Sequence, residues 1–206
     1  MLEGLRNEHK NTKYILGLLY LAVTRWEQGD PVPLEILVEG VEILQHYAEE
    51  SHQRLEEELL FPIMEKDGVP WRGGPLEVLE KEHHESRGYL IDLQHALESL
   101  RHDDPNAKEA IAENIKAYIM LLKAHMDKEE MIVFPIAERL LEESDVLQGD
   151  FAKMAGHLDW ENGHQEFIER LERGLGVSGR KVLDSFGQEQ NQHPDHLAEE
   201  FLNRPR

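Results

Sequence analysis

The stretch from His52 to Glu65, HQRLEEELLFPIME, places a histidine four positions before a glutamate and contains a Phe-Pro pair. The same pattern returns later in the chain, from His125 to Glu138, as HMDKEEMIVFPIAE. Half of the positions are identical in the two copies, including the histidine, the glutamate and the Phe-Pro pair. One His-x-x-x-Glu pair is common on helix surfaces, but its return in a matching context indicates two related helical units.

A second, shorter repeat has almost the same spacing along the chain as the first. Glu8-His9 precedes an apolar run near the start of the chain, and Glu82-His83 precedes another one in the second half. The chain therefore contains two similar halves, each with one lone histidine and one His-x-x-x-Glu motif. We interpret each half as a helical hairpin.

Apolar residues recur at three- and four-residue spacing through most of the chain, which predicts helices rather than strands. Gly/Pro-rich breaks occur at residues 29–33 and 68–75, and Asp104-Pro105 is typical of a helix cap followed by proline at the first helical position. We therefore expect long helices at roughly 3–28, 34–66, 76–101 and 105–143, with shorter helical segments near 148–174 and after 179.

This order of elements predicts an all-α fold, an up-down antiparallel four-helix bundle with additional C-terminal helices. The bundle is expected over residues 1–145. Residues 146–206 are expected to form a C-terminal helical extension packed on it.

Composition narrows the classes of function. The chain has 206 residues, a net charge of −20 and no cysteine, which argues against nucleic-acid binding and excludes thiolate chemistry. Its first residues, MLEGLRNEHK, are charged from Glu3 onward, unlike a signal peptide. The longest apolar run, residues 14–23, is too short to span a membrane. We expect a cytoplasmic protein.

The spacing of the histidines places them at matching heights. His9 and His52 are about equally far from the middle of the first turn, near Asp30, and His83 and His125 are equally far from Asp104. Because the rise per residue is constant in a helix, an antiparallel hairpin brings each pair to one level.

Positions i and i+4 share a helix face, so each motif points an imidazole and a carboxylate the same way. If all four faces turn inward, four imidazoles and two carboxylates converge in the middle of the bundle. Unpaired carboxylates are very costly there, and metal cations remove that cost. Two bridging carboxylates with two imidazoles on each ion suit a non-haem di-iron centre, although manganese or zinc accepts the same ligands. The alternative is a metal-free bundle whose inward histidines and glutamates pair with each other.

Four segments then carry a family resemblance: Glu8-His9, Tyr47-Ala48-x-x-x-His52-x-x-x-Glu56-Glu57-x-x-Leu60-Phe61-Pro62, Glu82-His83-x-x-x-Arg87 and Tyr118-Ile119-x-Leu121-Leu122-x-x-His125-x-x-x-Glu129-Glu130-x-x-Val133-Phe134-Pro135. In this combination the chain resembles the hemerythrin-like (HHE cation-binding) family, closest to its four-His/two-Glu di-iron type. The resemblance implies an up-down bundle holding two non-haem irons with an oxo or hydroxo bridge. It implies these metal ligands: His9, His52, His83 and His125 as terminal ligands, and Glu56 and Glu129 as bridges.

One position departs from the oxygen-carrying hemerythrins, which have a fifth histidine one turn after the position of His83. This chain has Arg87 there, and arginine stays protonated and cannot bind a metal ion. The four-histidine set is more similar to di-iron proteins of nitrosative stress and iron–sulfur cluster repair, and to iron-sensing domains. Repair proteins also have a cysteine-bearing segment, so the lack of cysteine argues against repair. Arg87 is a candidate to pair with Glu57 or Glu130 and so orient the ligands; alternatively these glutamates are solvated charges.

The sequence thus favours a di-iron protein that binds or reacts with dioxygen, peroxide or nitric oxide, in oxidative or nitrosative stress. The alternative is an iron-sensing, iron-buffering or iron-donor module without turnover. The expected partner is a small diatomic ligand, O2 or NO, with neither nucleic acid nor membrane. Open positions on both irons favour redox reaction over reversible carriage.

Other residues are assigned ordinary roles. The Phe-Pro pairs are interpreted as helix kinks or ends packed through the phenylalanines. A group of histidines is expected to lie off the inward face: His46, His84, His95 and His102. His157 and His164 are expected to have surface or packing roles, the alternative being contact with the site from a fifth helix.

Overall fold

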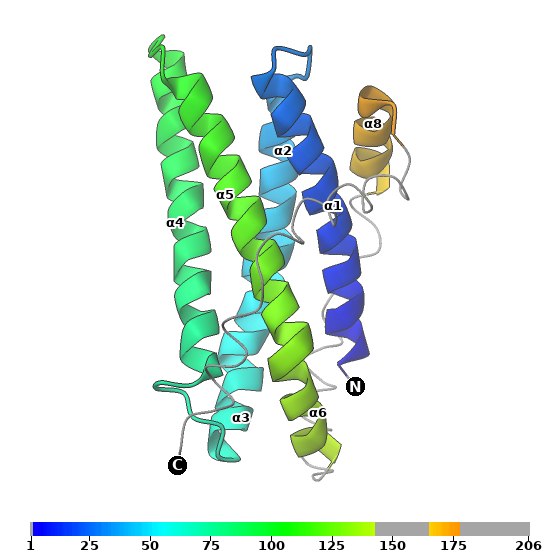
Figure 1. Cartoon of the computed structure of the whole chain (residues 1–206), viewed down its shortest axis with the longest axis vertical. Coiled ribbons are helices and arrows are strands. Elements are labelled where there is room, and N and C mark those ends of the chain that lie inside the picture. The colour runs from blue at the N-terminus through cyan, green and yellow to red at the C-terminus, as the bar shows by residue number, and fades with distance from the viewer. Residues whose placement is uncertain (1, 143–164, 178–206) are drawn as a thin grey trace.

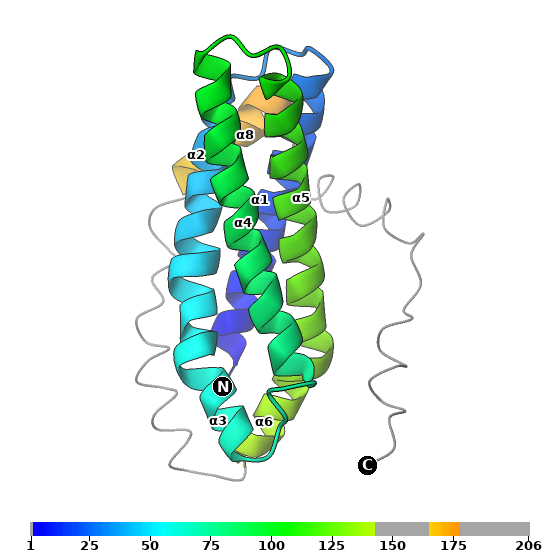
Figure 2. The same ribbon diagram turned by 90° about the vertical axis from the view of Figure 1, so that its left-hand side faces the viewer.

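The computed structural model describes residues 2–142 and 165–177, which form helices joined by turns. Four long helical segments run up and down beside one another, as Figures 1 and 2 show. The first and third segments are α1 (Glu3–Glu27) and α4 (Pro75–Arg101). None of the helices in the described ranges is long and apolar enough to cross a membrane.

The second and fourth segments are composite. The second covers residues 34–66 without a break and consists of α2 (Leu34–Leu44), η1 (Gln45–Gln53), η2 (Glu56–Leu60) and α3 (Phe61–Lys66). The fourth covers residues 107–142 and consists of α5 (Ala107–Lys128), η3 (Glu129–Val133) and α6 (Phe134–Glu142). The η elements are π-helices, which occur mostly as short insertions and often at functional sites. Both η2 and η3 begin at the glutamate of a His-x-x-x-Glu motif, whereas η1 has no counterpart in α5.

The predicted all-α bundle is confirmed, and the four long helices lie close to their expected ranges. One boundary differs, because the fourth helix begins at Ala107 rather than at Pro105. The Asp104 carboxylate accepts the N–H of Asn106 at 2.9 Å, and the Asp104 carbonyl accepts the N–H of Ala107 at 3.1 Å. Asp104 therefore closes a turn that precedes the helix.

The buried apolar residues form two clusters that lie above and below a polar layer. The upper cluster includes Ile15, Leu44 and Ile115, and the lower one includes Leu5, Phe61 and Phe134. Between them, at the level of His9, lie buried histidines and glutamates. The two clusters thus separate this polar layer from water at both ends of the bundle.

A short further helix, α8 (Gln165–Leu175), packs on the outside of α1. Its apolar side chains Phe167, Leu171 and Leu175 are buried, and the Arg25 guanidinium donates to the Leu175 carbonyl at 2.8 Å. This helix covers the end of the segment expected near residues 148–174 and extends one residue past it. Residues 148–164, including His157 and His164, and the segment expected after 179 lie outside the described residues.

Candidate metal centre

Four buried histidines come together in the polar layer, one from each long segment. They lie on α1, η1, α4 and α5, and each is at most 6% exposed: His9, His52, His83 and His125. Their Nε2 atoms point toward the middle of the bundle and form two pairs. The distance between the two nitrogens is 3.0 Å in the His9–His52 pair and 3.0 Å in the His83–His125 pair.

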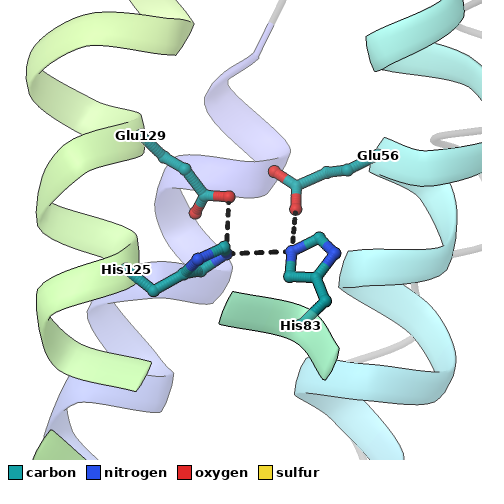
Figure 3. Close-up of side chains that lie close together, drawn as sticks. All are labelled: Glu56, His83, His125 and Glu129. Atoms are coloured by element: carbon teal, nitrogen blue, oxygen red, sulfur yellow. Dashed lines mark hydrogen bonds and ion pairs between the residues drawn. The ribbon is translucent and has the colours of Figure 1, made fainter. Parts of the chain in front are cut away.

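Two fully buried carboxylates, Glu56 and Glu129, lie between the histidine pairs; Figure 3 shows them with His83 and His125. Each carboxylate presents one oxygen to each pair. The distances from Nε2 to the nearest carboxylate oxygen are 3.5 Å for His52–Glu56, 3.5 Å for His83–Glu56, 3.1 Å for His9–Glu129 and 2.8 Å for His125–Glu129. The arrangement is therefore two nitrogen pairs joined by two carboxylates.

This geometry fits a pair of metal ions. Two imidazole nitrogens that bind one ion at about 2.1 Å and at right angles lie about 3.0 Å apart, which is the spacing in both pairs. While the imidazoles are neutral, the oxygens of Glu56 and Glu129 receive no hydrogen bond, and buried anionic oxygens need a donor or a cation. Two sets of donor atoms each lie within 4.8 Å of one another: Glu56, His83, His125 and Glu129, and His9, His52 and Glu129.

Each imidazole also contacts a further carboxylate, which lies beside the imidazole Nδ1 atom on the side away from the centre. The Nδ1–oxygen distances are 2.9 Å for His9–Glu130, 2.9 Å for His52–Glu8, 2.7 Å for His83–Glu57 and 3.0 Å for His125–Glu82. An ionised carboxylate only accepts hydrogen bonds, so Nδ1 carries the proton and Nε2 keeps its lone pair toward the centre. Two such lone pairs at the spacing observed here repel one another unless a proton or a metal ion lies between them.

The family comparison agrees with this site. The family model described as Hemerythrin HHE cation binding domain matches residues 1–137. The chain belongs to this hemerythrin family. It is also similar to Uncharacterized protein Rv1995 of Mycobacterium tuberculosis (strain ATCC 25618 / H37Rv) and Uncharacterized protein Mb2018 of Mycobacterium bovis (strain ATCC BAA-935 / AF2122/97). The identity is 26% over 186 residues, which cover 85% of this chain and 70% of each relative. No solved structure matches.

The two halves of the hemerythrin domain are related by an approximate twofold symmetry. Phe134 of the second half stacks on His9 of the first, with ring centroids 5.1 Å apart and planes at 20°. Phe61 of the first half stacks on His83 of the second, at 5.9 Å and 14°. The Phe-Pro pair of each motif therefore packs against a histidine of the other hairpin, beyond the helix kink or end inferred from sequence. Its ring fixes the orientation of that imidazole.

The same symmetry relates two cations behind the centre. Lys13 lies one turn after His9 and contacts Glu130 at 3.1 Å, and Arg87 lies one turn after His83 and contacts Glu57 at 2.6 Å. The histidine hydrogen bonds, together with these cations, lower the pKa of Glu57 and of Glu130 to about 2. Both carboxylates therefore remain ionised at neutral pH and keep their histidines in the orientation described above.

Protons compete with metal ions for the centre of this hemerythrin domain. Burial alone would lower the pKa of His125, but the Glu129 and Glu82 carboxylates raise it to about 10. The pKa of His52 and that of His83 are also raised by adjacent carboxylates. Since a metal ion must displace these protons, its apparent affinity increases as the pH rises toward the pKa of His125.

Some site residues could not be recognised from the sequence. Glu8 and Glu82 were visible there only as neighbours of His9 and His83, but each contacts the other histidine of its own hairpin. The repeated Glu-His dipeptide was the available signal. The four histidines expected to lie elsewhere are exposed: His46, His84, His95 and His102.

A small cavity adjoins the centre on the side of His9 and His52. Its volume is about 10 Å³, and the apolar residues Ala48, Leu122 and Met126 line it together with five polar ones: His9, Thr12, His52, Gln53 and His125. This space is about the minimum that holds one water-sized molecule. The side chain of Gln53 is buried, and its Oε1 atom has no hydrogen-bond partner. A molecule in the cavity would meet both the imidazoles and an unpaired amide oxygen.

We predict that Glu82→Ala lowers metal affinity by about 10- to 100-fold while the fold persists, because His125 loses the carboxylate that orients it. Glu85→Ala, an exposed position on the same helix, serves as the matched control and should leave affinity unchanged. Competition against a chelator of known affinity measures both variants. Equal affinities would show that Glu82 does not support the centre.

Proposed function

We propose that this hemerythrin domain holds two non-haem iron ions. In this proposal His9 and His52 bind one ion, His83 and His125 bind the other, and Glu56 and Glu129 each supply one oxygen to each ion. The observation that carries the proposal is the pair of 3.0 Å Nε2 spacings with unbonded carboxylate oxygens facing them. Bound iron would supply redox chemistry toward dioxygen, peroxide or nitric oxide.

The protein's own groups would prepare the site for such a small ligand. The carboxylates behind the imidazoles keep every Nε2 atom directed inward, and the two apolar clusters keep bulk water away. The cavity beside His9 and His52 has room for one small molecule. The Gln53 amide in its wall can hydrogen-bond that molecule, because an amide offers both a donor and an acceptor.

Arg87 supports redox reaction rather than reversible oxygen carriage. It stands where oxygen-carrying hemerythrins have their fifth histidine, and its guanidinium pairs with Glu57 instead of facing the centre. Each ion would have two imidazoles and one oxygen from each shared carboxylate, which leaves room for a ligand on both ions. We therefore propose a protein that reacts with dioxygen, peroxide or nitric oxide in oxidative or nitrosative stress.

Stopped-flow absorbance on the reduced, iron-loaded protein tests this proposal. We expect mixing with dioxygen or nitric oxide to oxidise or nitrosylate about two irons per chain, and removal of the gas under argon not to restore the starting spectrum. Clean reversal under argon would instead identify an oxygen carrier.

The same protein tests the alternative function. A redox protein should retain its iron through repeated cycles in the presence of a mild ferrous chelator. Rapid loss of iron to that chelator, without any reaction with either gas, would favour an iron-sensing, iron-buffering or iron-donor role. If the protein is purified with manganese or zinc in place of iron, that metal would be assigned to the two ion positions.

A further inference from the structure

The layer directly above the centre differs between the two halves of the domain. Leu122 lies three residues before His125 and lines the small cavity, and Glu49 lies three residues before His52 in the first half. At this sequence position the first half therefore has a carboxylate where the second half has an aliphatic side chain. Glu49 also lies in η1, the π-helix that has no counterpart in the second half.

The inner end of Glu49 is buried near two hydroxyl groups. Its Oε1 atom and the hydroxyl of Tyr118 on α5 are both buried and both lack a hydrogen bond. Ser86 on α4 lies nearby, and its hydroxyl donates to the His83 carbonyl at 2.9 Å. Burial raises the pKa of Glu49, and the nearby Ser86 and Tyr118 hydroxyls and the Arg87 guanidinium offset this only in part.

The outer side of Glu49 lines a larger cavity of about 430 Å³. Arg87, Glu57, Glu50 and Arg54 also line this cavity, and the side chains of Glu50 and Arg54 are 61% and 68% exposed. The cavity therefore reaches solvent. Among the described residues, three charged or titratable groups act on Glu49: Arg87 and His83 from α4 and Tyr118 from α5. Glu57 from η2, and Glu50 and Arg54 from its own segment, line the same cavity.

We propose that Glu49 carries protons between this solvent-filled cavity and the layer above the metal ligands. The role rests on the proposed function, since reduction of dioxygen or nitric oxide consumes protons in a site closed to bulk water. A hydrated proton in the cavity adds to the Glu49 carboxylate and forms an O–H bond. Rotation of the side chain turns this O–H inward, where the bond breaks and the proton passes into the layer above the metal ligands, which supplies the protons that reduction consumes. The carboxylate is regenerated, and the route carries no electrons.

Glu49→Gln tests the role, because it keeps the shape of the side chain but cannot exchange a proton at neutral pH. Glu50→Gln is the matched control, since Glu50 lines the same cavity but is exposed. The first measurement is infrared titration of the carboxylic-acid C=O band. We expect a band that titrates above the exposed glutamates, persists in Glu50→Gln, disappears in Glu49→Gln, and shifts immediately on mixing with D2O. A missing band, or a shift that takes hours, would overturn the proposal.

The second measurement is the rate of proton uptake after the reduced, iron-loaded protein is mixed with dioxygen, followed with a pH indicator. We expect uptake at least about tenfold slower in Glu49→Gln, which corresponds to about 1.4 kcal/mol, with unchanged iron content in all three proteins. Uptake at the wild-type rate would overturn the proposal. If wild-type protein reacts with neither gas, the proposed function fails, and the infrared exchange still decides whether Glu49 connects the core with solvent.

Discussion

Replacing Glu129 with alanine should reduce the metal content of the purified protein from about two ions per chain to well below one. Glu129 is fully buried and lies 3.1 Å from His9 and 2.8 Å from His125, so its loss removes an oxygen from both proposed ion positions. Loss of a group that merely orients a ligand costs about 10- to 100-fold in affinity. Loss of a shared ligand should cost more than about 100-fold on the same scale. Elemental mass spectrometry on protein expressed without an affinity tag measures the result.

Glu58→Ala is the control for this variant. Glu58 lies in the first motif two positions after Glu56, is 54% exposed at its side chain and pairs with Arg54 on the surface. This variant should retain the wild-type metal content. Circular dichroism of each variant checks that the helices form. Two ions per chain in a folded Glu129→Ala protein would rule out Glu129 as a shared ligand.

Removal of metal should lower the melting temperature of the protein by more than about 10 °C. A ligand present at about 1,000 times its Kd stabilises the folded state by about 4.1 kcal/mol, and two ions act together. In a chain of this size, each kcal/mol shifts Tm by about 2–4 °C. Differential scanning calorimetry of iron-loaded and chelator-treated protein measures this shift.

Glu129→Ala should not show this shift, whereas Glu58→Ala should show it in full. The metal-free variant should melt below metal-free wild type, because His125 loses the buried carboxylate that lies 2.8 Å from its Nε2 atom. A wild-type Tm that does not respond to metal removal would favour the metal-free bundle, in which the inward histidines and glutamates pair only with each other.

The long-range arrangement followed from the sequence because it depends on periodic spacing. The i, i+4 relation of His52 and Glu56 determines a helix face, and the balanced distances from the turns determine the heights of His9 and His83. These two properties are enough to bring six side chains to one level. The assignment of those six residues as metal ligands remains a prediction that metal analysis will decide.

Contacts that depend on helix rotation did not follow from the sequence. Glu8 and Glu82 reach histidines on neighbouring helices, and which histidine they reach depends on the angle at which the helices face one another. The π-helices were also not predicted, because no residue type in η2 or η3 specifies an extra residue per turn. Glu49 was missed for a further reason, since its importance appears only when its position is compared with Leu122 in the other half.

Phe61 and Phe134 each stack on a histidine of the other hairpin, and this arrangement has a consequence for synthesis of the protein. When only the first hairpin has left the ribosome, His9 lacks the ring that stacks on it and the Glu130 carboxylate that fixes its Nδ1 atom. Residues 2–66 alone offer two imidazoles and Glu56, an incomplete and solvent-open set. The proposed position of the first ion would therefore be enclosed only after Phe134 has emerged, and we expect the nascent protein to withdraw little metal from the cell's free pool before then.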